Sequence, residues 1–286
     1  MLPIGVMVNN LEPDRLTAFR VAADLGFRIV HTGTLPEAWL TGSQRQQYVD
    51  AARSSGIQIH SMFVGFDGQS YANLEAIRRT VGLLNPEFQE HRIGIASRYA
   101  DLARELGAPC LAAHIGFIPE TASDPQYTPL VTAVRRVADA AAARGLTLNL
   151  ETGQEPAAVL MHFLGDVARR NVGVNFDPGN FLLYGTDDPL PALRILQPWV
   201  RGVHCKDGKR PEESGLLGRE PALGHGDVPM AEVLAELLQA GYSGPLVIER
   251  ERSPHAVAEI LAARDLLQTL LSKVDKSGRL FHVERS

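Results

Sequence analysis

Four apolar segments in the second half of the chain each end on a side chain that can bind a metal ion. LTLNLE ends at Glu151, VGVNFD at Asp177, VRGVH at His204 and PLVIE at Glu249. Burying such a group without a partner is costly, so each of these segment ends needs an explanation. If the four segments are neighbouring parallel strands, their last residues converge, and three carboxylates with one imidazole make a divalent-cation site. The sequence therefore predicts a metal centre.

Strand-like and helix-like segments alternate along the whole chain and would position these groups. We expect strands at 3–9, 27–31, 57–64, 109–114, 146–151, 172–177, 200–205 and 245–250, and helices at 13–25, 43–55, 87–106, 127–144, 156–170, 188–197, 229–240 and 254–273. Eight such units predict a single α/β domain, a (β/α)₈ TIM barrel over about 3–273 with a tail at 274–286. A doubly wound open sheet is the alternative, but the first strand lacks the Gly-rich fingerprint of dinucleotide-binding sheets.

The ends of all eight expected strands carry polar groups, which a barrel would gather on its C-terminal face. These residues are Asn9, His31, His60, His114, Glu151, Asp177, His204 and Glu249. Each could instead cap its own strand in a local salt bridge, but the four carboxylate and imidazole ligands together favour one shared site. Mn²⁺ is the expected ion because oxygen ligands suit hard cations, with Mg²⁺, Co²⁺ and Zn²⁺ as alternatives. Long loops at 65–86 and 206–227 are expected to cover the site.

Composition narrows the classes of partner and compartment. The 286 residues carry a net charge of −5, which argues against general affinity for nucleic acid or an anionic membrane. No apolar run approaches the length of a membrane span, and MLPIGVMVNN has no cleavage-type signal. Cys110 and Cys205 both fall in expected strands, so a disulfide framework is not expected and the cytoplasm is the predicted compartment. The sequence leaves open whether the chain forms a homo-oligomer.

At these residues the chain resembles the sugar phosphate isomerase/epimerase family of xylose isomerase-like barrels. The resemblance covers about 3 to 273, and its motifs are LETGQE, NFDPGN, VHCKDG and LVIERE. It implies that Glu151, Asp177, His204 and Glu249 bind one metal ion. It also implies that Glu151 and Glu249 form the acid/base pair, one on each face of the substrate carbon.

The implied activity is metal-dependent isomerisation or epimerisation of a keto-sugar or related polyol. A cation bound by the carbonyl and its neighbouring hydroxyl stabilises the enediolate that forms when one carboxylate removes the proton between them. The second carboxylate then returns a proton. Metal-dependent elimination, by an inosose-type dehydratase or a 3-keto-glycoside deglycosidase, is the alternative, and a non-catalytic sugar-binding barrel is a further one.

Other polar residues near the strand ends are expected to contact a carbohydrate. His60 and His114 would donate hydrogen bonds to sugar hydroxyls, Gln154 would line the pocket, and Lys206 would meet a phosphate or carboxylate of the substrate. Asn180 stands where the epimerases usually carry His, and Arg210 matches their substrate-contacting arginine.

Three further expectations concern the surroundings of the site. Trp39 and Phe66 are candidates for an apolar wall, and Asp227 is expected to cap the helix that begins at Pro229. His60 and His114 also match two further metal ligands of endonuclease IV. The loop after the seventh strand lacks the remaining ligands of that three-metal cluster, which together with the acidic net charge disfavours a nuclease.

Overall fold

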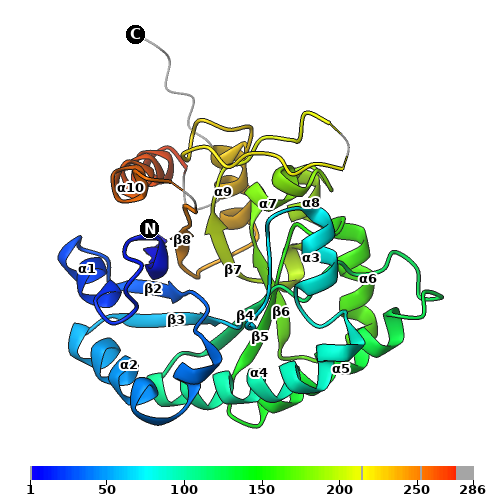
Figure 1. Cartoon of the computed structure of the whole chain (residues 1–286). Helices are drawn as coiled ribbons and strands as arrows, with labels where there is room; N and C mark the ends of the chain where they lie inside the picture. Colours follow the sequence, from blue (N-terminus) through cyan, green and yellow to red (C-terminus); the bar gives the residue numbers. More distant parts are fainter. Residues whose placement is uncertain (1, 214, 252, 275–286) are drawn as a thin grey trace.

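A computed structural model describes residues 2–274 except 214 and 252, and it shows a closed eight-stranded parallel barrel (Figure 1). The strands pair in sequence order, and β1 closes the barrel against β8 with Gly5 opposite Val247. The strands are β1 Ile4–Met7, β2 Ile29–Thr32, β3 Gln58–Phe63, β4 Cys110–Ala113, β5 Thr147–Glu151, β6 Val172–Phe176, β7 Val200–Cys205 and β8 Leu246–Ile248. The predicted barrel is confirmed, and the open sheet is excluded.

Helices surround the barrel and match the eight that the sequence predicts. They are α1 Ala18–Asp24, α2 Gly42–Ser55, α4 Pro86–Leu106, α5 Tyr127–Ala142, α6 Ala157–Val167, α8 Pro189–Leu196, α9 Met230–Gln239 and α10 Ala256–Ser272. Gly56 and Gly107 end α2 and α4 in the left-handed conformation, as expected of glycine at these positions. Among the described residues no helix combines the length and apolar character needed to cross a membrane.

Two short helices lie in connections that were expected to be loops. The helix α3 Leu74–Thr80 follows β3, and α7 Pro178–Tyr184 follows β6. Three 3₁₀ segments, η1 Val8–Asn10, η2 Glu37–Leu40 and η3 Gln197–Trp199, occupy other connections. The Asp177 carboxylate accepts a hydrogen bond from the backbone N of Asn180 at 3.0 Å and so caps α7. One side chain thus both starts this helix and belongs to the predicted metal centre.

Strand parity sends apolar side chains outward to the helices and polar side chains toward the barrel axis. Leu148 and Leu150 of β5 are buried in the main core, whereas Asn149 on the opposite face is buried without a hydrogen-bond partner among the described residues. Glycine makes room for this interior, because a Cβ on Gly202 would lie 2.4 Å from Asn175 Oδ1. The barrel interior below the site is therefore polar, as the sequence predicts.

A bulge between β2 and β3 changes the position of one predicted residue. Val30 pairs with Ile59, but the next residue, His31, pairs with Ser61. His60 is therefore the extra residue of the bulge, and bulges re-aim side chains in this way. Its Nδ1 lies 3.1 Å from His31 Nε2.

Candidate functional site

The four predicted metal ligands meet at the C-terminal end of the barrel. One ligand atom from each of Glu151, Asp177, His204 and Glu249 lies within 4.8 Å of the others, and all four residues are buried. His204 Nδ1 lies 2.8 Å from Glu151 Oε1, 3.2 Å from Glu249 Oε2 and 3.8 Å from Asp177 Oδ2. The structure thus brings together the residues that the four strand ends pointed to.

Strand register accounts for this convergence. Glu151 is the last residue of β5 and pairs with Asn175 of β6, so Asp177 follows two residues beyond it on the next strand. His204 of β7 pairs with Val247 of β8, so Glu249 again follows two residues further. Residues two apart on a strand share a face, so all four side chains point to the barrel axis.

A chain of three imidazoles orients His204. Its Nε2 lies 3.0 Å from His31 Nδ1, and His31 Nε2 in turn contacts His60. Burial, followed by the neighbouring imidazoles of His204 and His60, lowers the pKa of His31 well below its ordinary value. A neutral His31 can hold the Nε2 side of His204, which leaves Nδ1 facing the carboxylates. The Phe63 ring stacks on His204 at 5.0 Å between centroids and fixes the ring plane.

Lys206 is the buried cation nearest to the carboxylates. Its Nζ lies 2.8 Å from Glu249 Oε2, 3.6 Å from Asp177 Oδ2 and 3.4 Å from Glu251 Oε2. Burial acts to lower the pKa of Lys206, but the carboxylates of Glu249 and Glu251 outweigh it and the pKa lies well above its ordinary value. The ammonium group therefore stays charged in a site from which water is largely excluded.

The pKa shifts of the other residues in the cluster show that positive charge stabilises its carboxylates. Burial acts to raise the pKa of Glu249, but Lys206 and His204 hold it well below the usual range. Burial raises the pKa of Asp177 well above the usual range, against the opposing effect of Lys206. Burial acts to lower the pKa of His204, yet Glu249 and Glu151 raise it to about 10. In the protein alone, protons and Lys206 balance these negative charges.

The chemistry of the four residues fits a divalent cation. Asp177 Oδ2 is buried and makes no hydrogen bond within the described part of the chain, and His204 Nδ1 faces the same carboxylates. Buried polar atoms without partners are rare in proteins, and those at functional sites face ligands that complete them. Three carboxylates and one imidazole match the ligands that Mn²⁺ and Mg²⁺ take. These residues could therefore hold one such ion.

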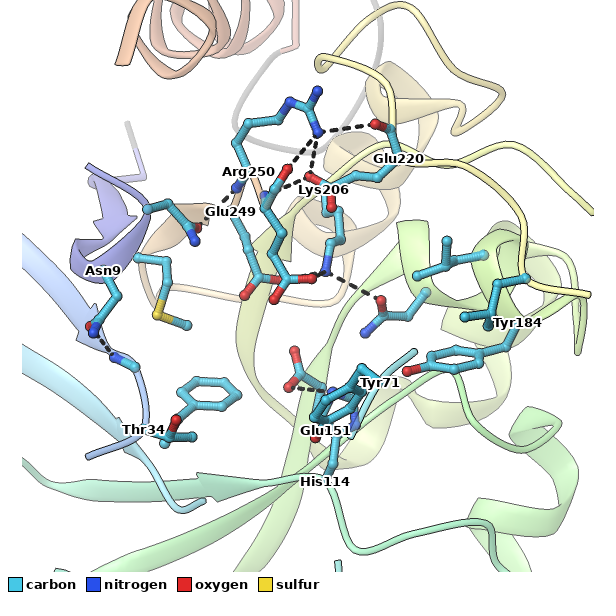
Figure 2. A pocket seen from close by; sticks show the side chains of 18 of the residues that line it. Asn9, Thr34, Tyr71, His114, Glu151, Tyr184, Lys206, Glu220, Glu249 and Arg250 are labelled. Atoms are coloured by element: carbon cyan, nitrogen blue, oxygen red, sulfur yellow. Dashed lines mark hydrogen bonds and ion pairs between the residues drawn. The ribbon is translucent and has the colours of Figure 1, made fainter. Parts of the chain in front are cut away.

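A cavity of about 680 Å³ opens over Glu151 and Glu249 of the four-residue cluster (Figure 2). Glu151, Glu249, His114, Asn180 and Lys206 all line it. His114 Nε2 lies 3.1 Å from Glu151 Oε2, and Lys206 Nζ donates to Asn180 Oδ1 at 3.4 Å. Three of the predicted substrate contacts, His114, Asn180 and Lys206, thus lie beside the metal-type ligands.

Arg210 does not reach this cavity, contrary to the sequence prediction. It is exposed and donates to the backbone O of Asp187 at 2.7 Å and to Asp188 Oδ1 at 2.5 Å. The chain turns away after β7 because the Asp207 carboxylate accepts hydrogen bonds from the backbone N of Gly224 and Gly226. This turn therefore places Arg210, six residues after His204, on the outside of the barrel.

Two other predicted contacts also lie outside the cavity lining. The His60 side chain turns to His31 in the bulge, and Gln154 is buried and does not line the cavity. His60 therefore supports a residue of the site, and neither residue lines its cavity. The expected cap at Asp227 is also wrong, because no side chain caps α9 and the carboxylate that organises this turn is Asp207.

The apolar wall comes from residues that the sequence did not single out. Phe66 is buried in the core and Trp39 packs against it, whereas the cavity is lined by Tyr71, Leu183, Tyr184 and Leu217. The polar residues Glu220, Arg250 and Glu251 line it as well. Arg250 and Glu251 follow Glu249 in LVIERE, a charged run that could have signalled them. The wall residues lie on loops and a short helix without a periodic pattern.

The chain belongs to the xylose isomerase-like TIM barrel family, which matches residues 19–270. A solved xylose isomerase domain protein from Planctomyces limnophilus is 38% identical, covers 95% of this chain and 98% of its own, and has a TM-score of 0.86. A xylose isomerase-like barrel from Mycobacterium smegmatis in complex with magnesium is 22% identical over 95% of this chain and 97% of its own, with a TM-score of 0.70.

Sugar enzymes also share the fold. D-allulose 3-epimerase from Methylomonas sp. in complex with D-allulose is 19% identical, covers 95% of each chain and has a TM-score of 0.69. Inosose dehydratase from Lacticaseibacillus casei is 23% identical over 46% of this chain and 49% of its own. The chain spans less than two thirds of the length of the curated relatives it matches. Epimerases and a dehydratase thus occur on this barrel.

Proposed function

We propose that this protein is a metal-dependent isomerase or epimerase of a keto-sugar or related polyol, acting by proton abstraction next to a carbonyl. One observation carries the proposal. Glu151 and Glu249, from strands on either side of Asp177 and His204, both line the cavity and both contact His204 Nδ1. Two carboxylates that flank one bound carbon can remove a proton from one face and return it on the other.

The proposed cofactor is one divalent cation, Mn²⁺ first, held by Glu151, Asp177, His204 and Glu249. When bound, such a cation supplies charge stabilisation to the oxygens of the enediolate. The chain's own residues do the rest of the work. Glu249 and Glu151 both line the cavity, so one carboxylate is suited to accept the proton and the other to return it. His114, next to Glu151, and Asn180, next to Lys206, are placed to hold substrate hydroxyls.

Elimination from the same keto-sugar is the second candidate function, and Lys206 favours it. Its ammonium group is buried, lies 2.8 Å from Glu249 Oε2 and lines the same cavity. A charged donor next to one of these two carboxylates can protonate an oxygen that leaves once the neighbouring carbon has lost its proton. The similarity to inosose dehydratase supports this reading.

The proposal also covers the cellular compartment and the size of the substrate. Both cysteines are buried and free, which agrees with a reducing cytoplasm. The buried carboxylates at the base of this cavity suit a small carbohydrate better than an extended polymer.

Proton exchange in D₂O tests the proposed function. The metal-loaded protein would be incubated with ketoses, inososes and 3-keto-glycosides, and deuterium incorporation would be followed by NMR. We expect exchange at the carbon next to the carbonyl, reduced at least about a hundredfold in Glu151→Gln and in Glu249→Gln. An epimer identifies the isomerase, and an unsaturated or cleaved product identifies the lyase. Exchange that persists in both variants would refute the assignment of the two carboxylates.

A further inference from the structure

We propose, building on the function above, that the substrate carries a second ring or a comparably large apolar group attached to its sugar or polyol ring. The group would bind against a distal wall, which consists of Tyr71, Leu183, Tyr184 and Leu217. This wall lines the same cavity as the metal-type ligands but contains no charged residue.

The volume of the cavity is larger than one sugar ring would fill. A volume of about 680 Å³ holds roughly twenty waters at about 30 Å³ each, whereas a hexose has only about twelve non-hydrogen atoms. Ligand cavities in proteins generally enclose most of the surface of their ligand. A free monosaccharide at the carboxylates would leave much of this cavity to water.

The distal wall is built by separate segments of the chain that line one cavity. Tyr71 belongs to the connection between β3 and α3, Leu183 and Tyr184 end α7, and Leu217 comes from the long connection after β7. The wall begins at Tyr71, whose ring lies 5.9 Å from that of His114 between centroids, and Figure 2 shows Tyr184 further from Glu151 than Tyr71 is. All four wall residues are half-buried, so the core does not use up their apolar surface.

The tyrosines of the wall supply aromatic rings. Gln69 Nε2 donates to the Tyr71 hydroxyl at 3.2 Å, which anchors that ring. The Tyr184 ring also packs edge-on against Phe117 at 6.0 Å between centroids, which holds it in place. Aromatic rings fixed in this way favour flat apolar groups through burial and ring stacking.

Arg250 and Lys206, which line the cavity, are each paired with carboxylates, which disfavours a phosphate beside these two residues. Arg250 binds Glu220 at 3.0 Å and Glu259 at 2.6 Å. Lys206 is shared by Glu249 and Glu251. An anionic group placed here would compete with these carboxylates, whereas an apolar group at the distal wall displaces only water.

Calorimetric titration of the metal-loaded full chain with three unreactive probes tests this inference. The probes are methyl β-D-glucopyranoside, phenyl β-D-glucopyranoside and methyl β-D-glucopyranoside 6-phosphate. We expect the phenyl glycoside to bind at least about tenfold more tightly than the methyl glycoside. Leu217→Ala should reduce that ratio at least about threefold and leave the affinity for the methyl glycoside unchanged. Leu216→Ala is the matched control, because Leu216 is exposed and does not line the cavity.

Several outcomes would overturn the inference. Equal affinity for the two glycosides, binding of neither, or a ratio that Leu217→Ala leaves intact would show that the distal wall takes no substrate group. Tighter binding of methyl β-D-glucopyranoside 6-phosphate than of the phenyl glycoside would assign the additional group as an anion. None of these results affects deuterium exchange that depends on Glu151 and Glu249, so the failure of this inference is distinguishable from the failure of the proposed function.

Discussion

Replacing Glu155 by Gln should stabilise the protein at neutral pH and leave it unchanged in acid. Glu155 follows the ligand strand β5 and is only 4% exposed, with a hydrogen bond from the backbone N of Ile118. Burial raises the pKa of this carboxyl from 4.5 to about 8.

The sign and size of the effect follow from proton linkage. Between pH 4.5 and 8 the folded state holds the Glu155 proton and the unfolded state has lost it, so stability falls as pH rises through this interval. Each pH unit corresponds to about 1.4 kcal/mol, so Glu155 costs up to about 3 kcal/mol at pH 7 and under about 1 kcal/mol at pH 5. Glutamine has the same shape and no charge at either pH. The variant should therefore gain that difference at pH 7.

Urea unfolding followed by circular dichroism at about pH 5, 6, 7 and 8 measures this gain. Glu120→Gln is the control, because Glu120 is exposed in the same region and its replacement removes the same charge. The free energy of unfolding of Glu155→Gln should exceed that of the wild type increasingly from pH 5 to 8. Equal stability at pH 7, or the same pH slope in both proteins, would refute the argument from burial.

Three further predictions concern the site. His31→Gln should weaken cation binding about 10- to 100-fold, as measured by calorimetry, while circular dichroism shows that the protein remains folded. Unchanged affinity would mean that His31 does not orient His204. Because His204 has a pKa raised to about 10, a cation must displace its proton, so affinity should rise up to about tenfold per pH unit between about pH 6 and 9. A pH-independent affinity would contradict this. Arg210→Ala should keep kcat/KM within about threefold of the wild-type value, whereas Lys206→Met should lower it at least about a hundredfold. A larger loss of kcat/KM in Arg210→Ala than in Lys206→Met would contradict the placement of these side chains.

The sequence predicted the barrel and its metal-type cluster because both depend on local patterns. An apolar run that stops at Glu151 or His204 marks a buried strand and its end, and parallel strands must gather such ends on one face. The short helices α3 and α7 were missed because seven residues are too few to show a helical period. The bulge at His60 cannot be predicted from the alternation of apolar and polar residues, because a bulge depends on how the strand pairs with its neighbour.

The surroundings of the cluster could not be predicted for a different reason. Arg210 was placed by its spacing from His204, but Asp207 turns the connection and takes Arg210 to Asp188. Tyr71 and Leu217 belong to long connections whose course is set by tertiary contacts. A substrate cavity made from such connections is fixed by packing rather than by local sequence.

The metal content of the purified chain tests the central claim most directly. We expect about one equivalent of a divalent cation after loading and dialysis, lost in Glu151→Gln and in Asp177→Asn. Glu251→Gln, which changes a cavity residue outside the four-residue cluster, should keep it. If the wild-type chain retains no cation after reconstitution with Mn²⁺, Mg²⁺, Co²⁺ or Zn²⁺, or if Asp177→Asn retains it fully, the four residues do not form a metal centre.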